Sequence, residues 1–103
     1  MNHDVTAVVL TRNASRTLEE CLKRLSFCDK LLIVDDGSTD ATETIVRSFN
    51  ARFVKHARTS FADQRNFALS LVSTKWSLFV DSDEMVSKAL QEEIIDAIVQ
   101  IKT

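Results

Sequence analysis

Short apolar runs alternate with amphipathic segments along this chain. Four runs rich in β-branched and aromatic residues have the character of buried strands, and they span residues 5–10, 31–34, 52–55 and 78–80. The third run is short and is expected nearer an edge. Between and after the runs, apolar residues recur at helical spacing. Strands that alternate with helices predict right-handed βαβ units, so the expected fold is α/β, a mostly parallel four-stranded sheet flanked by helices.

Each predicted helix has a start signal and an inward face. The candidate caps are Ser15, Asp40 with Glu43 three residues later, Ser60 with Asp63, and Ser87. The residues expected to face inward are Leu18, Cys21, Leu22 and Leu25 in the first helix, Ile45, Val46 and Phe49 in the second, Phe61, Ala68, Leu71 and Val72 in the third, and Leu90, Ile94, Ala97, Ile98 and Ile101 in the last.

Composition narrows the class of protein. The 103 residues suffice for one domain, expected to span residues 1–103, and 45% of them are hydrophobic. One Gly and no Pro argue against a loop-rich all-β domain. A net charge of -2 without a basic run gives no reason to expect nucleic acid as a partner. No signal peptide or membrane-length apolar stretch is visible, and both cysteines are expected to be reduced, so we expect a cytoplasmic location.

Two of the apolar runs end abruptly at carboxylates. The run over residues 31–34 leads into Asp35-Asp36, and the run over residues 78–80 leads into Asp81-Ser82-Asp83. In open α/β sheets, ligands collect outside the carboxyl ends of the strands. Two acidic clusters there repel one another unless a cation lies between them, and a divalent metal that carries a phosphorylated ligand is the natural candidate.

Each of these features also has a plainer interpretation. Asp-x-Asp by itself is often a solvated loop, and Asp40 is better read as a helix cap than as a ligand. Asp35 or Asp36 can accept a hydrogen bond from a nucleobase imide or a ribose hydroxyl. Arg65, near a helix N-terminus, can pair with a diphosphate or be a surface arginine.

Other sequence features restrict the chemistry. Gly37 sits where the backbone must turn sharply or approach a ligand closely. The two histidines, His3 and His56, belong to no recognisable catalytic triad, and the chain has no Gly-rich phosphate loop.

The arrangement resembles the inverting family 2 glycosyltransferases with the Rossmann-like GT-A fold. Four segments carry the resemblance: the strand over residues 5–10 with Thr11-Arg12-Asn13, the string Val34-Asp35-Asp36-Gly37-Ser38-Thr39-Asp40, the helix start Gln64-Arg65-Asn66, and Asp81-Ser82-Asp83-Glu84. Within the family, the chain is similar to a bacterial lipopolysaccharide-core and cell-envelope glucosyltransferase-like branch. The likeness covers nearly the whole chain, which would be the N-terminal, nucleotide-sugar-binding half of such an enzyme.

The resemblance implies a role for individual residues. Thr11 and Asn13 would line the nucleotide pocket, with Thr11 near the base, and Asp36 or else Asp35 would hydrogen-bond the uracil. Arg65, together with Gln64, would lie toward the ribose-diphosphate. Asp81 would sit near the ribose and sugar, and Asp83 would be the principal ligand of a divalent metal, Mg²⁺ or Mn²⁺. Such enzymes transfer a sugar, most often from a UDP-sugar, to a saccharide or lipid-linked acceptor with inversion.

The chain also departs from the family pattern. Arg12 stands where an aromatic often precedes the Asn, and Thr74-Lys75 stands where a Gly often precedes the fourth strand. Family enzymes bind the acceptor and supply the general base in a second half, so a base is expected beyond Thr103 and this chain alone is expected to have weak or no transferase activity. The exposed apolar surface would favour self-association. Relatives that use lipid-linked acceptors work at the inner face of the membrane, so peripheral association there is an open expectation.

Two other interpretations compete with the transferase. A haloacid-dehalogenase-like phosphatase also uses Asp-x-Asp, but after its first strand, whereas here three strands come before the strand that leads into Asp81. The other is a nucleotide-binding or interaction module of the same fold without catalysis.

Overall fold

The chain folds around one four-stranded parallel sheet. The computed structural model describes residues 3–102. The elements along the chain are β1 (Val5–Thr11), α1 (Leu18–Lys23), β2 (Lys30–Asp35), α2 (Thr42–Arg47), β3 (Arg52–Lys55), α3 (Phe61–Ser70), β4 (Trp76–Phe79) and α4 (Lys88–Lys102). The strand order is β3-β2-β1-β4, and every neighbouring pair is parallel. The predicted α/β class and the position of β3 at an edge are confirmed.

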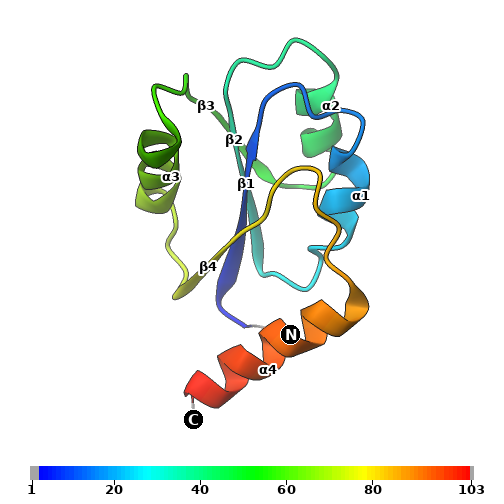
Figure 1. The fold of residues 1–103 in the computed structure, drawn as a ribbon, viewed down its shortest axis with the longest axis vertical. Coiled ribbons are helices and arrows are strands. Elements are labelled where there is room, and N and C mark those ends of the chain that lie inside the picture. Colours follow the sequence, from blue (N-terminus) through cyan, green and yellow to red (C-terminus); the bar gives the residue numbers. More distant parts are fainter. Residues whose placement is uncertain (1–2, 103) are drawn as a thin grey trace.

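Helices cover both faces of this sheet (Figure 1). Helices α1 and α2 lie on one face and α3 on the other. Successive side chains of a strand point to opposite faces, so Val9 and Ile33 pack with Leu18, whereas Val8 packs in a second cluster with Ala68. Strands buried on both faces are apolar throughout, which explains the continuous runs in the sequence.

The helix starts agree with the sequence at two of four positions. Ser60 Oγ accepts the main-chain N–H of Asp63, and Ser87 Oγ accepts that of Leu90, so both predicted caps are confirmed. The predicted cap at Ser15 is wrong, because α1 begins at Leu18 and Thr17 is its N-cap residue. The main-chain N–H of Ser15 instead donates to the Asp40 carboxylate (3.1 Å).

The predicted capping box ahead of α2 is also wrong. Ala41 is the N-cap residue of α2 and has no side-chain cap. Asp40 accepts the N–H of Thr42, so it supports the first turn from one residue further out. Glu43 does not reach back to the helix start; it pairs with Arg47 and Lys55.

The predicted inward-facing residues are mostly buried where a helix lies on the sheet. They are mostly exposed where a helix extends past the sheet. All four predicted core residues of α1 are buried, and Val46 and Ala68 are buried in α2 and α3. Phe61, by contrast, is 65% exposed. Among residues 88–101 of α4 only Ile98 is buried, and Leu90, Ala97 and Ile101 are exposed, because this helix runs beyond the end of the sheet (Figure 1).

The sequence led us to expect exposed apolar surface, and residues of α4 form such a surface. Leu90, Val99 and Ile101 are 44%, 47% and 62% exposed. Self-association through this surface stays a prediction. Within residues 3–102, no helix combines the length and the apolar character that a membrane crossing requires.

The two cysteines, one in α1 and one in the segment that follows it, are free thiols. Cys21 is fully buried and Cys28 is partly buried. Burial raises the pKa of Cys21 from 9.0 to about 11, and the carboxylates of Glu84, Asp83 and Asp81 add to this shift. Burial also raises the pKa of Cys28 to about 12, with a contribution from Asp29.

The raised pKa values of the two thiols predict that the folded chain loses stability at alkaline pH. Because the unfolded thiols ionise first, the free energy of unfolding should be unaffected by them below pH 9 and should fall as the pH rises from 9.0 to about 12. Urea unfolding across this range should therefore be more pH-dependent in the wild-type chain than in the Cys21→Ala/Cys28→Ala variant. Equal pH slopes for the two chains would contradict the prediction.

Candidate functional site

The carboxyl ends of the neighbouring strands β1 and β4 open onto a cleft of about 720 Å³. It is bordered by the loop after β1, the start of α3 and the segment after β4, which lie far apart in the sequence (Figure 1). Its lining residues are Leu10, Arg12, Asn13, Ala14, Arg16, Thr17, Phe61, Arg65, Phe79, Val80, Asp81, Ser82 and Asp83. A smaller hollow of about 150 Å³ adjoins it, lined by Leu10, Thr11, Arg12, Asp36, Arg58, Phe61 and Gln64.

The structure distributes the seven residues proposed for the site over three environments. Asn13, Arg65, Asp81 and Asp83 line the cleft. Thr11 and Asp36 line the hollow. Asp35 lines neither and is 1% exposed.

Asp35 is a buried carboxylate that the protein itself satisfies. One oxygen accepts the hydroxyls of Thr11 and Ser38, both at 2.6 Å, and the other accepts the main-chain N–H of Ser38 at 2.8 Å. A buried carboxylate is tolerated only when hydrogen bonds compensate its lost hydration. The Asp35 carboxylate and the Thr11 hydroxyl are thus bonded to each other, and a contact of either side chain with a ligand stays a prediction.

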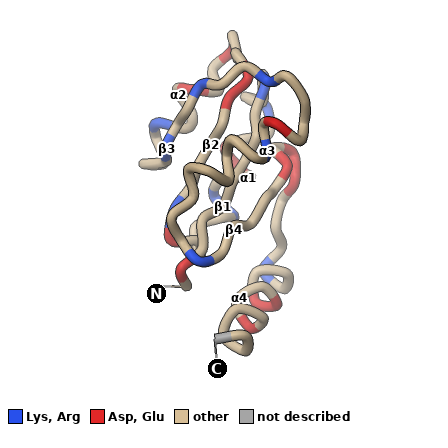
Figure 2. Tube along the Cα trace, turned by 90° about the vertical axis from the view of Figure 1, so that its left-hand side faces the viewer, with Lys and Arg blue, Asp and Glu red and all other residues tan. Residues whose placement is uncertain are grey.

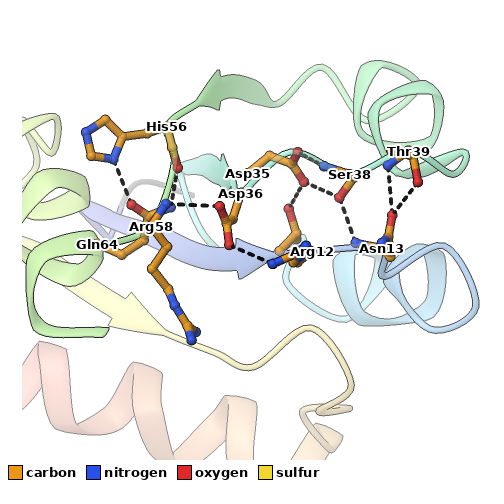
Figure 3. Close-up of polar contacts among 10 residues, drawn as sticks. Arg12, Asn13, Asp35, Asp36, Ser38, Thr39, His56, Arg58 and Gln64 are labelled. Carbon is orange, nitrogen blue, oxygen red and sulfur yellow. Dashed lines mark hydrogen bonds and ion pairs between the residues drawn. The ribbon is translucent and has the colours of Figure 1, made fainter. Parts of the chain in front are cut away.

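The loops after β1 and β2 are joined to each other beside Asp35 (Figure 3). The main-chain N–H of Asn13 donates to Ser38 Oγ (2.7 Å), and Asn13 Oδ1 accepts the N–H of Thr39 (2.8 Å). Asn13 has φ +52° and Gly37 has φ +72°, the left-handed region that these two residue types tolerate best. The sharp turn expected at Gly37 is confirmed.

Asp36 faces the hollow and is held more loosely than Asp35. Its carboxylate accepts the main-chain N–H of Arg58 (2.9 Å) and forms an ion pair of 3.6 Å with Arg12, as Figure 3 shows. The Arg12 side chain is 70% exposed, and an ion pair of this kind contributes at most about 1 kcal/mol. A ligand with suitable donors can therefore compete for this carboxylate.

The two polar residues at the start of α3 have opposite environments. Gln64 is 1% exposed; its amide donates to the carbonyl of His56 and accepts from the ring Nδ1, both at 2.8 Å. Gln64 borders the smaller hollow, and its position toward a ribose-diphosphate stays a prediction. Its spacing of four from buried Ala68 was the available signal for its burial. Arg65 is exposed in the cleft, with its guanidinium 4.8 Å from the ring centre of Phe79.

The acidic segment after β4 forms a closed turn. The main-chain N–H of Asp81 donates to the Glu84 carboxylate, and the N–H of Glu84 donates to the Asp81 carbonyl, both at 2.9 Å. Asp81 and Asp83 are exposed, and among residues 3–102 neither carboxylate has a hydrogen bond or an ion pair. They are thus available as hard oxygen ligands for a divalent metal.

These two carboxylates fit a metal that a second ligand also coordinates. Within residues 3–102, no three His, Cys, Asp or Glu side chains cluster closely enough to hold an ion alone. Mg²⁺ and Mn²⁺ are commonly bound by one or two carboxylates together with phosphate oxygens. The donor set at Asp81 and Asp83 has this character.

Both signs of charge occur at this end of the sheet. Basic and acidic positions alternate along the chain there (Figure 2), and the lining of the cleft includes Arg12, Arg16 and Arg65 together with the acidic turn. A ligand with both a diphosphate and a metal ion complements such a surface. Sequence reasoning missed Arg16, Thr17 and Phe61 as lining residues, because only the tertiary arrangement brings the start of α1 and of α3 to the same cleft.

The chain is a member of the glycosyl transferase family 2. The model of that family matches residues 6–103. Over 93 residues the chain is 34% identical to the lipopolysaccharide core biosynthesis glycosyltransferase LpsC of Rhizobium meliloti (strain 1021), an alignment that covers 85% of this chain and 34% of that protein.

Solved structures share the fold. S. aureus TarS 1-349 superposes with a TM-score of 0.80 at 27% identity, covering 97% of this chain and 33% of that chain; its complex with UDP gives 0.74 at 26%, with 97% and 32% covered. Glucosyl-3-phosphoglycerate synthase from Mycobacterium tuberculosis in complex with Mn²⁺, UDP and phosphoglyceric acid gives 0.69 at 26%, covering 79% and 33%. The chain spans about a third of the length of these relatives.

The contrast between Asp35 and Asp36 is testable by stability measurements. Asp35→Ala leaves the Thr11 hydroxyl and the Ser38 N–H without their acceptor, so urea unfolding should show a loss of about 2–5 kcal/mol. Asp36→Ala is the matched control and should cost no more than about 1 kcal/mol, because its ion pair is exposed. Equal losses in the two variants would refute the structural role assigned to Asp35.

Proposed function

We propose that this chain is the donor-binding portion of a glycosyltransferase that takes a sugar from a nucleotide-sugar, with UDP as the nucleotide. The observation that carries the proposal is the meeting of Asn13, Arg65, Asp81 and Asp83 in one cleft, with Asp36 in the adjoining hollow. Residues 1–103 would form one domain with this role. The UDP in the TarS complex and in the synthase complex supports the choice of nucleotide.

The nucleoside would be recognised in the hollow by Asp36. A carboxylate can accept the imide N–H of uracil, and Asp36 is the carboxylate there whose contacts are weak enough to exchange. The main chain at Thr11 and Asn13 would border the nucleoside, with the Thr11 hydroxyl kept by Asp35.

The diphosphate would lie in the cleft between the arginines and the acidic turn. Arg65 offers a planar, permanently charged donor for phosphate oxygens. Asp83, with Asp81 beside it, would hold a divalent metal, Mg²⁺ or Mn²⁺; the Mn²⁺ in the synthase complex supports this choice. When bound, the metal would stabilise the negative charge of the departing diphosphate.

The acceptor and the stereochemistry belong to the same proposal. The Rhizobium relative is named for lipopolysaccharide core biosynthesis, which supports a saccharide or lipid-linked acceptor of the cell envelope. Transfer with inversion requires a base that deprotonates the acceptor hydroxyl opposite the diphosphate. Glu84 is a poor candidate because its carboxylate accepts the Asp81 N–H. With no base assigned among residues 3–102, nucleotide binding without transfer by this chain remains the alternative.

Calorimetric titration of UDP with and without Mn²⁺ tests the donor site. The wild-type chain should bind UDP more tightly when Mn²⁺ is present. Asp83→Ala should abolish that gain, a loss of tenfold or more because a charge-assisted interaction contributes about 1.5–3 kcal/mol. Asp96→Ala, which removes an exposed carboxylate of α4, is the matched control and should bind like the wild-type chain.

Asp36→Ala separates base recognition from metal binding in the same assay. It should weaken UDP binding by a similar factor in the presence and absence of Mn²⁺, because the uracil contact does not involve the metal. A Mn²⁺ gain that survives in Asp83→Ala would reject the metal assignment. Absence of UDP binding by the wild-type chain in Mn²⁺ would reject the donor-site proposal itself.

A further inference from the structure

Thr17 occupies a helix N-cap position but does not cap the helix. A Thr at this position ordinarily accepts an N–H of the first turn with its hydroxyl. In α1 no such side-chain bond forms. The hydroxyl instead donates to the main-chain carbonyl of Ser82 (2.9 Å), 65 residues later in the chain. The hydroxyl of Thr17 is thus committed to the acidic turn and not to its own helix.

The acidic turn needs an external support. Asp81, Asp83 and Glu84 place three carboxylates within four residues, and like charges at this spacing repel one another. The turn's own hydrogen bonds join only Asp81 and Glu84. Ser82, which lies between the two proposed ligands, is held by Thr17.

Side chains at the start of α1 and within it contact the main chain of the acidic turn. The Cys21 thiol lies one helical turn beyond Thr17 and donates weakly to the Asp81 carbonyl (3.6 Å). Thr17 and Cys21 thus bind two successive carbonyls and leave the side chains of Asp81 and Asp83 unoccupied at the cleft. Since α1 is packed into the core through Leu18 and Leu22, these contacts tie the turn to a rigid element.

We propose that Thr17 is a positioning residue that holds the Asp81–Asp83 turn in the shape that binds a metal–diphosphate group. This inference rests on the proposed function. A turn already ordered before the ligand arrives avoids the entropic cost of ordering it on binding. Loss of the Thr17 hydroxyl would therefore weaken metal-dependent binding in particular, although Thr17 itself coordinates nothing.

The test compares Thr17→Val with Thr17→Ser in the full chain. Valine keeps the shape of threonine and removes the hydrogen bond, whereas serine keeps the hydroxyl. Thr17→Val should weaken UDP binding in Mn²⁺ about tenfold, the equivalent of one lost hydrogen bond, and by less than about twofold without metal. Thr17→Ser should restore binding close to the wild-type value. Thr44→Val, at an exposed position of α2, is the matched control and should change nothing.

Amide hydrogen exchange of the ligand-free chain provides a second readout. The Glu84 N–H, which closes the turn on the Asp81 carbonyl, should exchange faster in Thr17→Val than in the wild-type chain and Thr17→Ser. If Thr17→Val fails to fold, Thr17→Ala takes its place against Thr17→Ser.

Three results would overturn the inference. They are wild-type binding by Thr17→Val, a loss that is equal with and without Mn²⁺, and a loss that Thr17→Ser does not recover. Each leaves the donor site intact, because Asp83→Ala would still remove the metal-dependent gain. If the wild-type chain shows no such gain, the proposed function fails first and this inference fails with it.

Discussion

The buried carboxylate of Asp35 is the constraint on which the arrangement of the site depends. Its charge, enclosed at the end of β2, is tolerable only while Thr11 and Ser38 donate to it. Those bonds fix the end of β1 against the turn after β2. Once Ser38 is fixed, its hydroxyl accepts the Asn13 N–H, and the two loops that border the cleft are held in one relative position.

The next residue, Asp36, is also a carboxylate, but its surroundings differ from those of Asp35. Asp35, the last residue of β2, turns into the protein, while Asp36, the first residue after the strand, borders the hollow. The first carboxylate stabilises the loops, and the second remains exchangeable because its ion pair with Arg12 is exposed. The paired acidic motif is thus divided into a buried carboxylate and a carboxylate at the hollow where the strand ends.

The far side of the cleft is organised differently. Its acidic turn follows an edge strand, β4, and depends on α1 for support through Thr17 and Cys21. The two walls therefore differ in rigidity: buried hydrogen bonds fix one, and a few contacts to main-chain carbonyls fix the other. The charges at Asp81 and Asp83 stay unpaired within residues 3–102, which is costly in isolation and favourable once a metal and a diphosphate share the cleft.

The sequence by itself determined the strands, the helices on the sheet, the α/β class and the family, because local periodicity and a short acidic string encode them. It placed Asn13, Arg65, Asp81 and Asp83 correctly at one edge of the sheet. Only the tertiary structure decided that Asp35 and Gln64 are buried, because burial depends on which distant segments pack over a residue. The same holds for the exposure of Phe61, and for that of Leu90, Val99 and Ile101 in α4, a helix that extends past the sheet that would cover it.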